Sequence, residues 1–336
     1  MPHLFLASIG PVQDFIASAR RSRDLRFGSR LLSDLAKVAA AKIAAADGAN
    51  QLIFPALPDA ESASDREISV PNKILARVES DPVALGRSIE AAVHAELQRH
   101  QEVGYRQVSG TFDQIVAAAQ VADLIELVWV ALPLDGEYSQ TRARLDALLA
   151  ARKATRNFGP STWGSAQPKS SLDGQRESVI PEIKYPARGD EQTRQEKIAR
   201  LYAEYGAGPA ERLSGVDLLK RQGNAGADAR FPSTSHIAAL PLMIGLDRNQ
   251  GATAKRAWNT YITTLEEALK PLSLARVANE HPLHEILGEY EGDLLFEERL
   301  VDLFEGLGPA ARKDPRLAQA QKALRAFFDQ VGGPAP

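Results

Sequence analysis

Apolar residues follow two different spacings along the first part of the chain. A short apolar run from His3 to Ile9 ends at Gly10-Pro11, which predicts a buried strand closed by a turn. Residues 12–19 and 31–43 carry apolar side chains at helical spacing, and Ser29 is the expected N-cap of the second stretch. The chain therefore opens with a strand that is followed at once by helical segments.

The same two spacings recur up to about residue 135. They predict strands at 51–54, 74–78 and 125–132, and helices at 82–103 and 111–123. Strand, helix, strand, strand, helix, strand is the order of the ferredoxin-like split βαβ fold, which also forms the core of polymerase and cyclase palms. We therefore predict a ferredoxin-like (degenerate palm or cyclase-like) domain over residues 1–136.

Helical spacing dominates after residue 137. A stretch at 156–190 that is rich in Pro, Gly, Ser and charge interrupts it, and a loop of this length is usually functional or mobile. The predicted class is α+β, with the first domain followed by a mainly helical region over 137–336. The helices expected in that region are 139–153, 191–205, 209–222, 235–245, 251–270, 292–306 and 315–331.

The composition of the chain excludes several kinds of site and segment. A net charge of −3 gives no overall attraction to nucleic acid, so any such contact must come from a local patch. The sequence has no cysteine, which excludes disulfides and thiolate zinc sites and fits a reducing cytoplasm. No run of about 18 apolar residues is present, so we expect no membrane-spanning helix.

The first candidate site is the turn after the first strand, formed by Ser8, Ile9, Gly10, Pro11 and Gln13. Free N–H groups and the dipole of a following helix favour an anion such as a nucleotide phosphate there. A tight strand-to-helix turn, which any βα unit needs, explains the same residues. A metal-binding palm carries a carboxylate where this chain has Ser8, so Mg²⁺-assisted phosphoryl transfer is not expected, and we predict neither catalytic nor metal-binding residues.

The second candidate site is a cluster of arginines. Guanidinium groups bind phosphates in a bidentate manner, and Phe27 adds an aromatic ring suited to a base or a partner protein. The alternative is a solvated face whose arginines pair with Asp14, Asp24 and Asp34. The predicted RNA- or partner-binding residues are Arg20, Arg21, Arg23, Arg26 and Arg30, together with Lys169 and Arg176 in the long loop.

Two further motifs receive a structural interpretation. Ser233 or Thr234 in the segment 231–236 is typical of a helix N-cap, and the sequence places no base beside a nucleophilic serine. His281 and His284 precede Glu285, but the order does not match the helical zinc motifs, and Pro282 makes the segment a turn.

Together and in this order, these motifs resemble the large, palm-domain subunit of type III-B CRISPR effector complexes, the Cmr complexes. The similar segments extend over almost the whole chain. They are Ile9 to Ile16, Arg23 to Leu25, Gly28-Ser29, Pro71 to Lys73, Arg152 to Phe158, Pro168 to Ile180, Leu213 to Arg221, Phe231 to Ile237 and Asp293 to Glu298.

The resemblance implies that this chain is the N-terminal portion of such a subunit. Members of the family continue into a second palm with a Gly-Gly-Asp-Asp signature, which makes cyclic oligoadenylates from ATP. This sequence has neither that signature nor an HD nuclease domain, and it lacks the cysteine zinc site that the family usually carries near 157–190. We therefore expect a split gene product or a shortened subunit that has no activity alone.

The resemblance also implies ligands and partners. ATP and Mg²⁺ belong to the complete subunit, not to this chain alone, and the first palm lends one wall of the ATP site near Gly10. The implied partners are the subunit that binds the 5′ handle of the guide RNA, the small subunit, a second palm-bearing polypeptide or segment, and guide and target RNA through the complex, with no membrane. Two alternatives stay open: a nucleotide-dependent transferase that acts alone through Gly10 and Ser233-Thr234-Ser235, and an interaction module without RNA contact.

Overall fold

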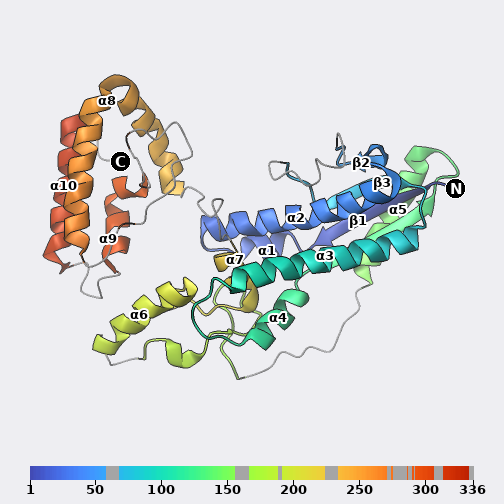
Figure 1. Cartoon of the computed structure of the whole chain (residues 1–336), viewed down its shortest axis with the longest axis horizontal. Coiled ribbons are helices and arrows are strands. Elements are labelled where there is room, and N and C mark those ends of the chain that lie inside the picture. Colours follow the sequence, from blue (N-terminus) through green and yellow to red (C-terminus); the bar gives the residue numbers. More distant parts are fainter. Residues whose placement is uncertain are drawn as a thin grey trace. The chain divides into compact units, whose positions relative to one another are not determined.

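The computed structural model contains two compact units (Figure 1). The first comprises Met1–Pro181 and Glu204–Ala225, and the second comprises Glu182–Ala203 and Gly226–Pro336. The expected domain boundary at residue 136 stays a prediction. The structure describes residues 1–57, 68–155, 166–187, 191–223, 234–270, 274, 286, 290, 292–305 and 313–332.

The first unit is built on a four-stranded antiparallel sheet in the order β2-β3-β1-β4. Strands that are not adjacent in sequence pair at its centre, where Leu6 lies opposite Leu75 on one side and Val130 on the other. This is the ferredoxin-like order, and it confirms the predicted α+β class. The strands are β1 (His3–Gly10), β2 (Leu52–Phe54), β3 (Lys73–Val78) and β4 (Glu126–Pro133).

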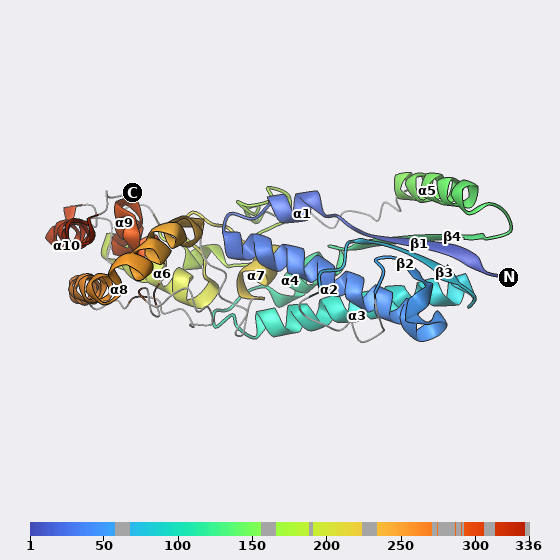
Figure 2. The same ribbon diagram turned by 90° about the horizontal axis from the view of Figure 1, so that it is seen from above.

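Two long helices, α2 (Ser22–Asp47) and α3 (Pro82–Tyr105), cover one face of the sheet (Figure 2). Phe5, Ala7 and Ile9 of β1 point into this core because alternate residues of a strand share a face. The helix α3 approaches β4 so closely at Gly86 that a Cβ there would lie 2.2 Å from the Trp129 ring, so only glycine fits.

The opposite face carries α5 (Tyr138–Ala154), which packs over β1 and β4 (Figure 2). Leu145 and Leu149 of this helix form a second, smaller core with the even-numbered residues of β1, Leu4 and Leu6. Ser8 continues the even-numbered series. The side chain of Ser8 therefore belongs to the α5 face of the sheet.

The helices near the end of β1 differ from the prediction. The expected helix over 12–19 is only α1 (Gln13–Ala17). Arg23, Arg26 and Arg30 of the arginine-rich stretch lie within α2, where Ser29 is an interior residue. Charged residues masked the apolar spacing there, but Phe27 and Leu31 keep the helix against the core. We therefore correct the predicted start of this helix from Ser29 to Ser22.

A late segment of the chain returns to the first unit as α7 (Gly215–Gln222), and α4 (Gln114–Ala122) lies against it. The predicted helix over 209–222 starts only at residue 215, because Ser214 and Asp217 form a capping box. Val216 and Leu219 of α7 join the core that contains Phe27.

The second unit is helical in its described parts. The two helices predicted over 235–270 are merged into α8, with a kink at Gly251 (φ 11°, ψ −86°). Trp258 and Tyr261 of α8 pack against Phe327 of α10. The helices of this unit are α6 (Glu191–Tyr205), α8 (Thr234–Leu269), α9 (Glu297–Glu305) and α10 (Pro315–Val331). Short 3₁₀ turns occur at Glu182–Lys184 and Gly292–Leu295 in this unit and at Ala49–Gln51 in the first unit.

Candidate functional site

The turn after β1 is held from one side and open on the other. The Ile9 N–H donates to the Asn72 carbonyl at 2.8 Å, and the Asn72 amide donates to the Ile9 carbonyl at 3.0 Å. A Cβ added at Gly10 would have no atom within 4 Å. The turn, which includes a cis Gly10-Pro11 bond, is therefore fixed in place and has free space beside Gly10.

The helix that follows this turn is too short to supply the expected dipole. The five residues of α1 begin after Val12, whose side chain makes no cap hydrogen bond, and Gln13 is exposed. A helix macrodipole needs several aligned turns of backbone. Any attraction of an anion to this turn must therefore come from side chains.

Two lysines provide such side chains on the α5 face. Lys153 at the end of α5 donates to the Ser8 hydroxyl at 2.7 Å, and Lys73 lies opposite Ser8 in the strand register. The Lys73 ammonium is 2.8 Å from Asp146, which also accepts from Arg142 at 2.7 Å. Hydrogen bonds from Arg142 and Lys73 lower the pKa of the Asp146 carboxyl.

Sequence reasoning did not assign Lys73 or Lys153 to the site, although both lie in segments that carried the family resemblance. The alternation of β1 indicated that Ser8 shares a face with Leu6. The sequence predicted a helix over 139–153, but it held no signal that this helix packs on the sheet and brings Lys153 to this face.

The predicted arginine cluster is distributed over several carboxylates and a carbonyl. Arg21 lies 3.1 Å from the Glu211 carboxylate. Arg23 lies 3.7 Å from the Asp24 carboxylate, and Arg30 lies 3.7 Å from the Asp34 carboxylate. Arg20 donates to the Ser171 carbonyl at 2.9 Å, while Arg26 is exposed. The predicted pairing with Asp24 and Asp34 is thus observed for two of the five arginines.

The innermost of these contacts form a buried ion-pair network, which we call the α7 clasp: Arg21, Asp24, Glu211 and Arg221. The Arg221 side chain has no exposed surface and lies 2.9 Å from Asp24 and 3.0 Å from Glu211. Burial alone would raise the pKa of Glu211, but hydrogen bonds from Arg221 and the Gly208 N–H outweigh it and lower that pKa to about 2. The clasp joins the start of α2 to α7 within the first unit.

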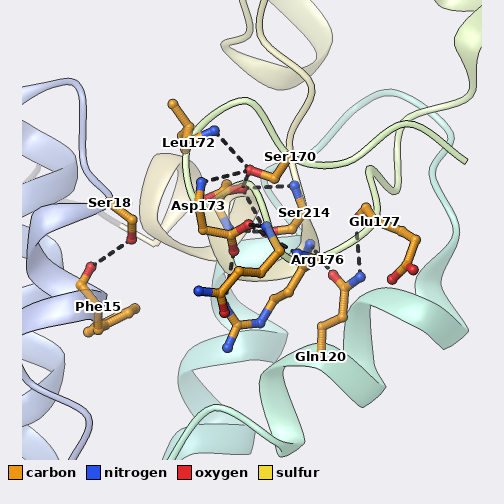
Figure 3. Close-up of polar contacts among 12 residues, drawn as sticks. Phe15, Ser18, Gln120, Ser170, Leu172, Asp173, Arg176, Glu177 and Ser214 are labelled. Carbon is orange, nitrogen blue, oxygen red and sulfur yellow. Dashed lines mark hydrogen bonds and ion pairs between the residues drawn. The ribbon is translucent and has the colours of Figure 1, made fainter. Parts of the chain in front are cut away.

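A second buried cation of α7 contacts α1 and its C-cap. The Lys220 ammonium donates to the Phe15 carbonyl and, at 2.7 Å, to the Ser18 hydroxyl. The Ser18 hydroxyl itself donates to the Phe15 carbonyl (Figure 3). It also lies 4.3 Å from the centroid of the Phe15 ring. Burial lowers the pKa of Lys220 to about 8.

Residues 166–187 of the long loop are tied to α7 by hydroxyl and carboxylate groups. Ser170 donates to Asp217 at 2.6 Å and accepts from the N–H groups of Leu172 and Asp173 (Figure 3). Within the loop, Lys169 lies 2.6 Å from Glu177, and Arg176 lies 2.9 Å from Asp173. The two loop cations predicted to contact a polyanion are therefore each paired with a carboxylate of the same loop.

One suggestion from the sequence is wrong. Phe27, which we expected to offer its ring to a base or a partner, is 2% exposed and packs in the core with its ring edge toward His100. Its helical position points it inward because Leu31 and Leu35 follow at the same spacing. Exposed aromatic side chains of this unit are instead Phe54 in β2 and Tyr138 in α5, neither of which was selected from the sequence.

The remaining candidates contribute little to a site. His281, His284, Glu285 and the segment 231–233 lie outside the described residues. Within the described ranges, no three His, Asp or Glu side chains gather in a way that could hold a metal ion. In the same ranges, every helix is too short or too polar to cross a membrane.

The strand order and the two helices on one face define a ferredoxin-like domain. Residues 4–103 match the family model described as CRISPR-associated protein Cmr2, N-terminal. This match confirms the resemblance to the Cmr large subunit for the N-terminal part of the chain. No curated protein matches the chain.

Two solved structures are similar in fold. One is described as the apo state of a type III-B Cmr-beta complex, with a TM-score of 0.55 and 14% identity over 75% of this chain. The other is Cmr-beta bound to cognate target RNA, with the same score and identity over 96% of this chain. The matches cover 37% and 43% of those chains, so this chain spans less than half of their length.

Proposed function

We propose that this chain is the N-terminal portion of the large subunit of a type III-B CRISPR effector complex, where it acts as a scaffold for other subunits and RNA. The observation that carries the proposal is the ferredoxin-like sheet, whose region 4–103 matches the Cmr2 N-terminal family. The fold likeness to a target-RNA-bound Cmr-beta complex over 96% of the chain supports the same role. Its partners are then other Cmr subunits, guide RNA and target RNA.

Assembly tests this role directly. The tagged chain is expressed together with the other Cmr subunits of its own source and a guide RNA, and the material that elutes with it is identified by mass spectrometry. We expect the subunit that binds the guide 5′ handle, the small subunit and a palm-bearing polypeptide to elute with the chain. Assembly of those subunits on guide RNA while the tagged chain stays separate would contradict the role.

Within the complete subunit, the first unit lends one wall of an ATP site at Ser8, Ile9, Gly10, Pro11 and Gln13. Lys153 supports this assignment because its ammonium donates to the Ser8 hydroxyl, and Lys73 lies opposite Ser8 in the neighbouring strand. Phosphate oxygens bind such groups well. The open space beside Gly10 would allow a ligand to approach the backbone.

The wall is tested with Lys153→Ala in the presence of the palm-bearing partner. We expect ATP affinity, measured by isothermal titration calorimetry, to fall about tenfold, because charge-assisted bonds contribute on the order of 1–3 kcal/mol. Arg144→Ala is the matched control, since Arg144 is an exposed cation of the same helix. Equal ATP affinity of the Lys153→Ala and Arg144→Ala variants would show that Lys153 does not contribute to ATP binding.

The arginine cluster keeps a narrower role in this proposal. Arg20 and Arg26 are exposed and are the members best placed to contact RNA or a neighbouring subunit, whereas Arg21 belongs to the α7 clasp. A charge reversal at Arg20 and Arg26 should reduce the salt dependence of assembly on RNA. An unchanged salt dependence would leave both arginines without this function.

A further inference from the structure

The part of the sheet formed by β2 and β3 carries an exposed aromatic side chain on the α5 face. Phe54 is 50% exposed and lies opposite Leu75 in the register. Leu75 belongs to the small core beneath α5, and side chains directly opposite each other in neighbouring strands share a face. The ring of Phe54 therefore lies on the α5 face, at the edge strand of the sheet.

Two cations flank this ring on the neighbouring strand. Lys73 and Arg77 stand two residues before and after Leu75, so they share its face at diagonal positions, about 7–8 Å from a residue opposite Leu75. Their side chains are 41% and 45% exposed, and each pairs with a carboxylate that is also exposed, Asp146 or Glu79. Exposed ion pairs add little stability, so these cations can turn to another anion at small cost.

The local charge is opposite in sign to that of the whole chain. Four cations lie on this face, Lys73, Arg77, Arg142 and Lys153, against three carboxylates, Glu79, Asp146 and Glu126, which leaves a balance of +1. The complete chain has a net charge of −3. A polyanion is therefore attracted to this face and not to the molecule in general.

We propose that this surface, formed by Phe54, Lys73 and Arg77, binds single-stranded RNA, with a base stacked on Phe54 and phosphates on the two cations. An aromatic ring on a four-stranded sheet between cations combines the two contacts that single strands use, stacking and phosphate pairing. A protein partner would need a larger apolar patch. Within β2, Phe54 has one exposed apolar neighbour, Ile53, which lies at the register shift between Leu52 and Phe54.

The test is fluorescence anisotropy of a labelled oligouridylate of about 12 nucleotides, a length within the usual range for such surfaces, titrated with the full chain at low salt. Phe54→Ala should weaken binding about tenfold, and Phe54→Trp should restore it, because a base stacks on either ring. Ile115→Ala is the matched control: Ile115 is 84% exposed on α4, so its loss should leave affinity unchanged.

The cations are tested through salt dependence. Arg77→Ala should lower affinity a few-fold and reduce the slope of log affinity against log salt by about 0.7, the value for one phosphate of a single strand. Arg87→Ala removes the same charge from an exposed position of α3, a helix on the opposite face, and should change neither quantity.

Three results would overturn the proposal. The first is no binding by the wild-type chain at low salt. The second is an equal loss of affinity in Phe54→Ala and Ile115→Ala. The third is RNA affinity that survives Phe54→Ala while the chain no longer joins the other Cmr subunits, which would assign the surface to a protein partner. Because the assay needs no second palm and no ATP, its outcome is separate from that of the proposed ATP wall.

Discussion

Arg221 in α7 and Lys73 in β3 both contact carboxylates, but they do so in different surroundings. Arg221 is fully buried between Asp24 and Glu211, whereas Lys73 and Asp146 are each 41% exposed. A buried cation needs its partners for the fold to persist, while an exposed pair contributes little and can be exchanged. A dense group of arginines in a sequence is therefore a weak guide to a ligand site, because buried ion pairs can hold the arginines. The exposure of a cation in the folded protein is a better guide.

The largest expected effect comes from breaking the α7 clasp. Arg221→Ala leaves two carboxylates without their buried partner and should lower the free energy of unfolding of the first unit by about 3–5 kcal/mol. Urea unfolding is followed through Trp129 fluorescence, in a background with Trp163 and Trp258 replaced by phenylalanine. Arg144→Ala, on the exposed side of α5, should change stability by less than about 0.5 kcal/mol.

Acid should remove the stability that the clasp contributes. The folded-state pKa of Glu211 is about 2, below its ordinary value, so its stabilisation is complete above the unfolded pKa and is lost as pH falls toward 2. We expect a loss on the order of 2 kcal/mol between about pH 5 and pH 2. The Glu211→Gln variant should lose less over the same range, and parallel curves for the two proteins would argue against this assignment.

Lys220 should give a pH dependence of the same sign as Glu211, but in the alkaline range. Its folded pKa is about 8, below the model-peptide value, so the unfolded chain binds more protons above pH 8 and stability should rise with pH. Between about pH 7.5 and 9.5, the wild type should gain on the order of 1 kcal/mol relative to Lys220→Met. Urea unfolding at several pH values measures the difference, and a gain of equal size in Lys220→Met would exclude Lys220 as its origin.

The smallest expected effect lies on the α5 face. Arg77→Ala should change the free energy of unfolding by less than about 0.5 kcal/mol, because its pair with Glu79 is exposed on both sides. The same variant is expected to weaken RNA binding. A loss of several kcal/mol in the free energy of unfolding would mean that the exposed Arg77 pair stabilises the fold as much as the buried α7 clasp does, which would contradict the comparison.

Local spacing was sufficient to predict much of the first unit. The strands at 74–78 and 125–132, the helix at 82–103 and the ferredoxin-like order depend on alternation or helical spacing within short segments, which a single sequence displays. The start of α2 was missed because arginines interrupted its apolar spacing.

The contacts of the site depended on pairings between distant segments. Lys153 reaches Ser8, and Arg221 reaches Asp24, only after the sheet and α7 have assembled. Phe27 is an aromatic residue among arginines, which is typical of a binding site, but its side chain is buried and packs against Gly223. No local pattern contains the contacts of Lys153 and Arg221, because each joins positions far apart in the sequence.

The return of α7 to the first unit also constrains how the protein is made. Val216 and Leu219 occupy the same core as residues of β1 and α2, although the ribosome adds them long after β4. During vectorial synthesis, the nascent sheet must wait with one side of that core uncovered until α7 has left the ribosome, an interval in which chaperones have access to it.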